Sequence, residues 1–361
     1  MQSTLLSIQK LTKTYPGVIA LNDFSMQFEK GEVHALLGEN GAGKSTLIKI
    51  VSGAIEPNSG SIILDGKQFL RMDPHLSRQH GVAVIYQEFS LVESLSIAQN
   101  VYLGSGKGIF TDYQRLIEQT KQIFKEINID LDPAAKVRTL SPAKKQLVEI
   151  AKAVSRNAKI LIMDEPTAPL SASEVETLFA IIANLKKRGV TIVYISHRIE
   201  ELFQISDRVT VMRDGQFIKT LITKQTNRQE LINLMVGREL REYYPHRMAQ
   251  LGHPVLEVKN ISGNGDHNIS FSLNQGEILG IAGLVGSGRT ELVNLIYGTL
   301  PKDSGTVVIR GETVEIRSPR VAITHGIGLI PEDRKFHGCI LNADVFFNIN
   351  LSVSNKFSRR F

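Results

Sequence analysis

The fold is decided by one stretch of the sequence, Gly38-Glu39-Asn40-Gly41-Ala42-Gly43-Lys44-Ser45-Thr46. This stretch contains the phosphate-binding pattern G-x-x-x-x-G-K-[ST]. Its glycines let the backbone wrap so that N–H groups converge on phosphate oxygens. Within the pattern, Lys44 is expected to reach the β- and γ-phosphates and Ser45 to bind Mg²⁺. All the residues from Gly38 to Thr46 are therefore candidates for binding a nucleotide.

The sequence on either side of this loop has the expected character. An apolar segment, Val33 to Leu37, precedes the loop and predicts a strand. An amphipathic segment, Ser45 to Val51, follows it and predicts a helix whose positive end points at the phosphates. A glycine-rich turn that fitted the phosphate-binding pattern by chance would have no reason to lie between a predicted strand and a predicted helix. The order strand, loop, helix therefore predicts an α/β protein.

A second candidate element is a pair of acids, Asp164 and Glu165, at the end of the apolar run Ile160 to Met163. A run of this length predicts a buried parallel strand. Doubly wound sheets bind ligands at the carboxyl ends of their strands. Asp164 is suited to binding Mg²⁺, and Glu165 to polarising an attacking water. Alone, such a pair could equally be a solvated turn; the phosphate loop upstream favours the functional interpretation.

The composition indicates a globular protein of 361 residues, with 42% hydrophobic residues and a net charge of +6. No apolar run approaches the ~18 residues needed to cross a bilayer, and the N-terminus lacks the features of a secretion signal. The lone cysteine, Cys339, excludes an internal disulfide and fits a reducing compartment. Basic and acidic residues are interleaved without an arginine-rich block, so no nucleic-acid partner is expected. These features predict a cytoplasmic protein.

The chain also repeats itself. Residues 31–66 align without gaps to residues 276–311, with Gly38 matching Gly283 at an offset of 283 − 38 = 245. Such repeats indicate copies of one unit. We therefore expect a first domain over residues 5–238, a linker over 239–254, and a second copy over 255–361. Because Phe361 maps to Leu116, the second copy is expected to be incomplete.

The order of motifs resembles that of the ATPase subunits of ABC transporters. The motifs are the phosphate loop, Tyr86-Gln87, Leu140-Ser141, Asp164 to Thr167, and Ser196-His197. The resemblance is closest to the fused double-domain subunits that drive bacterial import of monosaccharides such as ribose, galactose and allose. Three stretches favour that branch: GLVGSGRTEL at 283–292, IPEDRK at 330–335, and YISHRIEELFQISDRVTVMRDG at 194–215.

The resemblance implies a fold and further site residues. The fold is a P-loop NTPase of the ABC ATPase type, with a mixed sheet core and a helical subdomain, followed by a partial second copy. Tyr15 corresponds to the aromatic that stacks on adenine, and Ser141 to the signature that meets the nucleotide. Gln87 corresponds to the residue that links the γ-phosphate and Mg²⁺ to the transporter-facing subdomain, and His197 to a switch on the γ-phosphate. Glu165, His197 and Gln87 are then the catalytic candidates; Ser45, Gln87 and Asp164 are the metal candidates.

The resemblance also implies cofactors and partners. The cofactors are ATP and Mg²⁺. The partners are a membrane permease for a sugar and, through it, a periplasmic sugar-binding protein; a homodimer through the first copy is also expected. The chain would then work on the inner face of the bacterial membrane.

Two departures from the family pattern bear on hydrolysis. The signature, usually Leu-Ser-Gly-Gly-Gln, reads Leu140-Ser141-Pro142-Ala143-Lys144. Ser141 can still cap a helix with proline at its first position, but Pro142 has no N–H for the phosphate, a loss of about 1–3 kcal/mol. In the second copy, Arg289 replaces Lys44, and the two side chains are not interchangeable at a close-packed phosphate.

Three alternatives remain from the sequence. The first is an inactive remnant of such a subunit, either a truncated gene product or a fragment of a longer one. The second is a soluble ABC ATPase working on ribosomes or DNA, although the long coiled-coil or basic insertions usual in that class are missing. The third is an unrelated phosphate-loop kinase, which would not explain the repeat or Ser196-His197.

Overall fold

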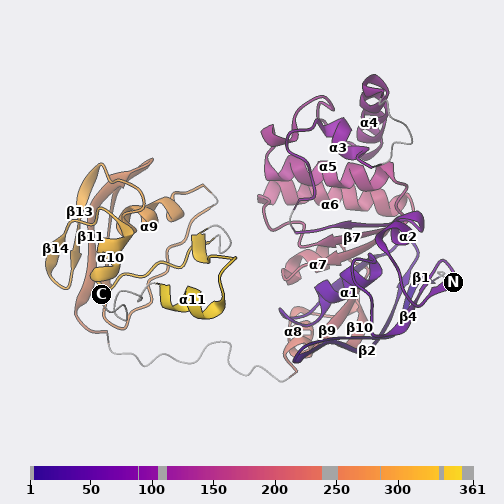
Figure 1. Cartoon of the computed structure of the whole chain (residues 1–361), viewed down its shortest axis with the longest axis horizontal. Helices are drawn as coiled ribbons and strands as arrows, with labels where there is room; N and C mark the ends of the chain where they lie inside the picture. The colour runs from indigo at the N-terminus through magenta and orange to yellow at the C-terminus, as the bar shows by residue number, and fades with distance from the viewer. Residues whose placement is uncertain are drawn as a thin grey trace. The chain divides into compact units, whose positions relative to one another are not determined.

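The computed structural model describes residues 4–87, 89–104, 112–237, 251–284, 286–332 and 337–351. The chain divides into two compact units, Met1–Tyr243 and Tyr244–Phe361. Most of the linker expected over 239–254 lies outside the described residues, and a strand of the second unit begins at Pro254. Each unit is described by itself (Figure 1).

The first unit is built on two sheets. The central sheet has the strand order β10-β9-β3-β8-β7-β6, parallel except for β10, which is antiparallel to β9. Its strands are β3 (Val33–Leu37), β6 (Val82–Ile85), β7 (Ile160–Asp164), β8 (Thr191–Ile195), β9 (Arg208–Arg213) and β10 (Gln216–Ile222). The second sheet is antiparallel in the order β2-β1-β4-β5. Its strands are β1 (Thr4–Tyr15), β2 (Val18–Glu29), β4 (Ser59–Leu64) and β5 (Lys67–Phe69).

Alternation along the central strands creates two cores. In β8, Ile192 and Tyr194 face a core shared with the larger helices, whereas Val193 and Ile195 face the second sheet. Successive side chains of a strand point to opposite faces of the sheet, so a strand that is buried on both faces contributes to two cores. Figure 1 shows α5 and α6 along one face of the central sheet and α1 on the other. The helices of this unit are α1 (Lys44–Val51), α2 (Pro74–Gln79), α3 (Ile97–Val101), α4 (Tyr113–Ile127), α5 (Pro142–Ser155), α6 (Ala172–Lys187), α7 (Ile199–Ile205) and α8 (Arg228–Val236).

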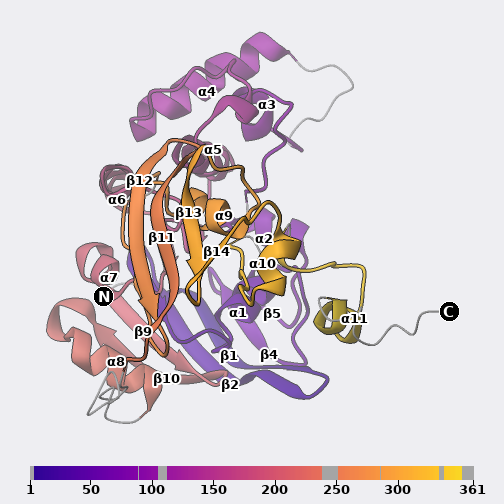
Figure 2. The ribbon, with the colours of Figure 1, turned by 90° about the vertical axis from the view of Figure 1, so that its left-hand side faces the viewer.

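Helices α3, α4 and α5 pack against one another and form the helical subdomain, visible beyond the sheets in Figure 2. Their ends follow local capping rules. Ser96 forms a capping box with Gln99 at the start of α3, and Asp112 accepts from the Arg115 N–H at the start of α4. Helix α4 ends at Asn128, whose left-handed conformation asparagine tolerates well. The predicted mixed sheet with a helical subdomain is therefore present in the first unit.

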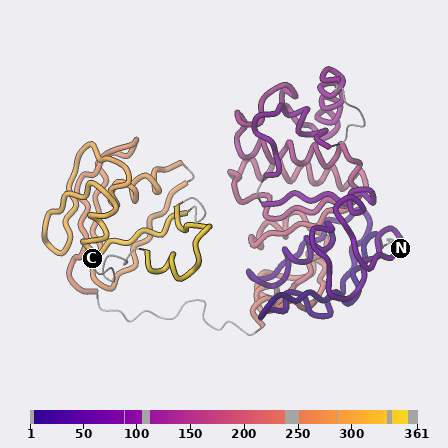
Figure 3. Tube along the Cα trace, in the orientation of Figure 1, coloured from indigo at the N-terminus to yellow at the C-terminus, as the bar shows by residue number. Residues whose placement is uncertain are grey.

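The described residues of the second unit repeat early elements of the first. The sheet of the second unit has the order β12-β11-β13-β14, and the core of the unit is formed by this sheet with α9 and α10. Figure 3 traces the backbone of this unit in orange and yellow. Residues 277–284, which match β3 at the offset of 245, form no strand. In the first unit, β3 is held by β8 and β9, and among the described residues of the second unit no strand pairs with this segment. The elements of this unit are β11 (Pro254–Gly263), β12 (Asp266–Asn274), α9 (Arg289–Tyr297), β13 (Ser304–Ile309), β14 (Glu312–Val314), α10 (Pro319–Thr324) and α11 (Val345–Asn350).

The two copies offer a matched test of what strand pairing contributes. Leu36 in β3 is 0% exposed, whereas its counterpart Ile281 is 42% exposed. We expect Leu36→Ala to lower the free energy of unfolding by about 2–5 kcal/mol, because it opens a cavity between packed layers. Ile281→Ala should change it by less than about 0.5 kcal/mol. Urea unfolding of both variants beside the parent chain measures the difference, and equal losses would contradict this description of the two segments.

Candidate ATP-binding site

Four neighbouring strands of the central sheet end beside one another and carry most of the candidate residues. In the sheet order β3-β8-β7-β6, the phosphate loop follows β3 and His197 follows β8. Asp164 ends β7 with Glu165 after it, and Gln87 follows β6. Because parallel strands present their carboxyl ends at one edge, the topology gathers residues from across more than half of the first unit.

The phosphate loop is held in a wrapped form by its own backbone. Gly43 caps α1 with φ +100°, and a Cβ at this residue would collide with the carbonyl oxygen of Ala20. Only glycine fits both constraints. The Lys44 Nζ donates to the carbonyl oxygens of Gly38 at 2.6 Å and Glu39 at 2.9 Å, across the loop. Helix α1 begins at Lys44, one residue before the predicted start, so its N-terminus faces into the loop.

Burial disfavours the charged forms of two side chains at the loop, Lys44 and Asp164. Burial lowers the pKa of Lys44, although the Glu165 and Asp164 carboxylates raise it. Burial also raises the pKa of Asp164, and the neighbouring Glu165 charge raises it further. Both shifts mean that the fold holds charged groups in surroundings that solvate them less than water does. Perturbed groups at a strand edge are typical of a functional site.

Glu165 contacts two other candidate residues, His197 and Gln87. Its Oε1 lies 3.1 Å from His197 Nδ1, and its Oε2 accepts a hydrogen bond from Gln87 Nε2 at 3.5 Å. Glu165 has φ +49°, a left-handed conformation that costs a non-glycine residue roughly 1–2 kcal/mol. Its N–H donates to the Ile195 carbonyl at 2.9 Å, which ties this strained residue to the end of β8. Strain of this kind concentrates at functional sites.

Two sequence candidates have other surroundings. Tyr15, at the end of β1, is 43% exposed, and the Lys13 ammonium lies 5.4 Å from the centre of its ring. Ser141 caps α5 and accepts a hydrogen bond from the Lys144 N–H at 3.4 Å, with Pro142 at the first helical position. The predicted cap at Ser141 is therefore confirmed. Within the described part of the chain, neither residue bonds to Lys44, Glu165 or His197.

The second phosphate loop differs in a way that sequence reasoning missed. Asp266 stands where 266 − 245 = 21 places Leu21 in the first copy. It is 9% exposed, and its Oδ2 has no hydrogen-bond partner among the described residues. A Cβ on Gly288, the cap of α9, would collide with this carboxylate. A buried negative charge against the loop repels phosphate, which adds to the effect of Arg289. The sequence signal that could have indicated this difference is an acidic residue in the second copy at a position that is apolar in the first copy.

A family model described as "ABC transporter" matches residues 21–168 and 267–345. The chain belongs to the ABC transporter family. The two matched segments fall in the two copies of this ABC ATPase. The phosphate loop, Asp164 and Glu165 lie within the first of them.

Several known proteins resemble this ABC ATPase over nearly its whole length. The ribose import ATP-binding protein RbsA of Geobacillus kaustophilus strain HTA426 is 44% identical, over 96% of this chain and 71% of the relative. The xylose import ATP-binding protein XylG of the same strain is 44% identical, over 99% of this chain and 74% of the relative. A putative ribose/galactose/methyl galactoside import ATP-binding protein of Burkholderia lata is 45% identical, over 99% and 71%.

Solved structures show the same fold. A nucleotide-free ATP-binding cassette from an ABC transporter superposes with a TM-score of 0.59 at 23% identity, covering 68% of this chain and 100% of that chain. The ADP conformation of another such cassette gives 0.59 at 24% identity, covering 65% and 100%. The fold class that the motifs implied is thus confirmed. In the described part of this ABC ATPase, no helix combines the length and apolar character that crossing a bilayer requires.

Asp164 yields a stability prediction from its pKa. A carboxyl whose folded pKa lies above its unfolded value destabilises the fold, and the effect grows as pH rises through that range. At pH 7 and without nucleotide, Asp164→Asn should therefore raise the melting temperature. The matched control is Asp207→Asn, which should lower it, because the Asp207 carboxylate pairs with Lys186 Nζ at 2.6 Å and accepts from the Val33 N–H at 2.9 Å. Thermal unfolding measures both; a lower melting temperature for Asp164→Asn would be the contradicting result.

Proposed function

We propose that this chain is the ATP-binding subunit of a sugar importer, which binds and hydrolyses ATP in its first unit to power transport through a partner membrane permease. The observation that carries the proposal is the convergence of the phosphate loop, the Asp164–Glu165 pair and His197 at one edge of the central sheet. The names of the relatives, ribose and xylose import ATP-binding proteins, support a monosaccharide as cargo. The domain division is proposed as residues 5–238 and 255–361, with a linker over 239–254.

The donor set fits Mg²⁺ together with ATP. Ser45, Gln87 and Asp164 offer a hydroxyl, an amide oxygen and a carboxylate, the hard oxygen ligands that Mg²⁺ prefers alongside phosphates. The raised pKa of Asp164 marks a carboxylate that a cation would stabilise in its charged form. When bound, Mg²⁺ would neutralise charge on the transferred phosphoryl group.

The chain's own residues would bind the nucleotide and assist the attack of water. Lys44 would exchange its carbonyl partners for phosphate oxygens, and Tyr15 would stack on adenine. Glu165 would accept a proton from the attacking water, with its carboxylate held by Gln87 and His197. His197, 62% exposed, would turn toward the γ-phosphate. The Ser141 end of α5 would meet the nucleotide of a second chain, so that hydrolysis would require a homodimer.

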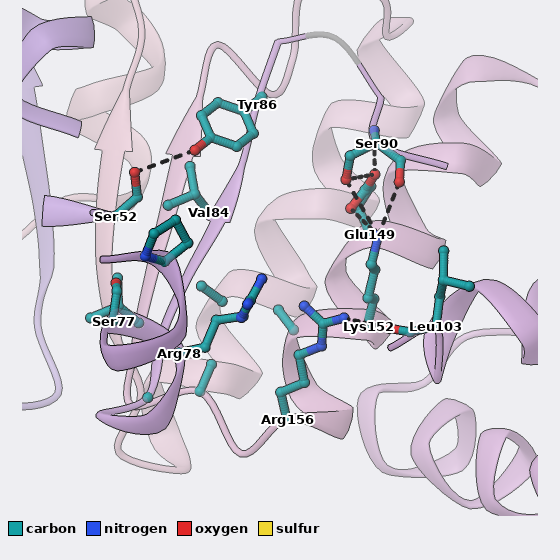
Figure 4. Close-up of a pocket in the computed structure, with 16 residues that line it drawn as sticks. Ser52, Ser77, Arg78, Val84, Tyr86, Ser90, Leu103, Glu149, Lys152 and Arg156 are labelled. Atoms are coloured by element: carbon teal, nitrogen blue, oxygen red, sulfur yellow. Dashed lines mark hydrogen bonds and ion pairs between the residues drawn. The ribbon is translucent and has the colours of Figure 1, made fainter. Parts of the chain in front are cut away.

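A cavity of about 310 Å³ supports the proposed permease contact. It lies in the first unit between α2, β6 and α5, and Figure 4 shows Tyr86, the neighbour of Gln87, at its edge. Arg78 and Arg156 point into the same space from α2 and from the end of α5. A polar or acidic segment of a permease would complement these charges. The subunit would then work on the inner face of the membrane, with a periplasmic sugar-binding protein delivering the sugar from the other side.

Turnover tests the proposal and its main rival, an inactive remnant. Mg-ATP hydrolysis by the purified chain should fall at least about 100-fold in Glu165→Gln, because the variant lacks a general base. Nucleotide binding by that variant should persist. The exposed Glu176→Gln on α6 is the control and should retain the parent rate.

The signature is tested in the same assay. Pro142→Gly restores a backbone N–H, so turnover should rise about tenfold. A parent chain that binds Mg-ATP without turnover, together with recovery in Pro142→Gly, would place the defect in the signature. Absence of nucleotide binding would overturn the proposed function in favour of the remnant.

A further inference from the structure

A buried carboxylate that the proposed mechanism does not use lies behind the site. Glu201, on α7, has a side chain that is 8% exposed. Its Oε2 accepts hydrogen bonds from three hydroxyls: Tyr194 at 2.7 Å, Ser196 at 2.9 Å and Thr167 at 2.9 Å. Its Oε1 accepts a hydrogen bond from Arg198 Nη1 at 3.3 Å. Both carboxylate oxygens are therefore partnered, which burial of a charge requires.

Two of these hydroxyls come from the loops that carry the catalytic candidates, and the third, that of Tyr194, comes from β8. Thr167 lies two residues after Glu165, in the loop that follows β7. Ser196 directly precedes His197, in the loop that follows β8. Thr167 and Ser196 are both buried, and the Ser196 hydroxyl also accepts from the Arg198 N–H at 3.0 Å. Glu201 is thus the common acceptor that joins the loop of the general base to the loop of the switch histidine.

The contacts around Glu201 are strong and interdependent. Hydrogen bonds to a charged acceptor in a buried setting are stronger than neutral ones, and they reinforce one another. Burial and the Glu201 charge hold the pKa of Tyr194 far above its ordinary value, so its phenol stays protonated and remains a donor. By contrast, the imidazole of His197 is largely exposed, so side-chain packing restrains it little. The position of His197 therefore depends on its neighbour Ser196 and on the contact with Glu165.

We infer that Glu201 is a positioning residue that fixes His197 against Glu165 and so sets the site's discrimination of ATP from ADP. The inference rests on the proposed function, in which His197 meets the γ-phosphate. Only ATP presents that phosphate. Loosening the Ser196 anchor should therefore weaken ATP binding and leave ADP binding intact. A purely structural role predicts a different pattern, in which stability falls and both nucleotides are affected alike.

The matched pair Glu201→Gln and Glu200→Gln separates these roles. Glutamine keeps the length and one acceptor oxygen of Glu201 but lacks its charge, and it turns an NH₂ group toward Arg198. Glu200 is the preceding residue, exposed on α7 and paired with Arg228 at 3.5 Å. Mg-ATP and Mg-ADP affinities of the full chain are measured by titration calorimetry, beside melting temperatures. We expect Glu201→Gln to reduce the ATP-over-ADP preference about tenfold, with ADP affinity within about twofold of the parent; Glu200→Gln should match the parent for both.

A double-mutant cycle with His197→Ala tests the route of the effect. His197→Ala should reduce the same preference, and Glu201→Gln should add nothing further in the double variant, because both changes act on one contact. Additive losses, or equal losses for ATP and ADP in Glu201→Gln, would overturn the inference while leaving the proposed function in place. Failure of the parent chain to bind nucleotide would overturn the proposed function and, with it, the inference.

Discussion

The parallel pairing of β3 with β8 and β9 is the interaction on which the rest of the first unit depends. This pairing places the phosphate loop beside the end of β8. Strand β7 pairs with the other edge of β8, so Asp164 and Glu165 at the end of β7 lie near the same end of the sheet. The second copy keeps the glycines of the loop, but among the described residues its segment 277–284 pairs with no strand. A glycine-rich loop therefore follows a paired strand in the first unit and an unpaired segment in the second. A phosphate loop binds well only when the strand before it is fixed, because its N–H groups must converge on one point.

The site's chemistry follows from charges that this framework crowds together. Asp164 and Glu165 are adjacent carboxylates facing Lys44, and burial keeps both Lys44 and Asp164 away from their ordinary pKa values. The left-handed backbone at Glu165 adds strain, and a hydrogen bond to Ile195 holds that residue in place. A nucleotide with its cation would relieve much of this imbalance. The fold thus gives up some stability at the residues that we propose to bind and react, which is the usual relation between stability and activity at such sites.

The elements set by local rules could be predicted from the sequence. The strand Val33–Leu37, the acids at the end of β7 and the cap at Ser141 all follow from apolar runs and capping preferences. Glu201 could not be predicted in this way, because it accepts from Thr167 across 34 residues of sequence and only the fold brings the two together. A tyrosine on the buried face of β8, which needs an acceptor, was the one available hint. Asp266 was missed although its aligned position is apolar in the first copy, because only the fold brings its carboxylate against Gly288.

We propose that the chain binds a single nucleotide, in its first unit. Equilibrium titration of the full chain with Mg-ATP, counting bound nucleotides per chain, tests this most directly when Lys44→Ala and Arg289→Ala are compared. We expect one nucleotide per chain, lost in Lys44→Ala and kept in Arg289→Ala, because Lys44 bonds across its loop to Gly38 and Glu39, and the described residues of the second loop show no such bond from Arg289. Two nucleotides per chain, or binding that survives Lys44→Ala and is lost in Arg289→Ala, would contradict it.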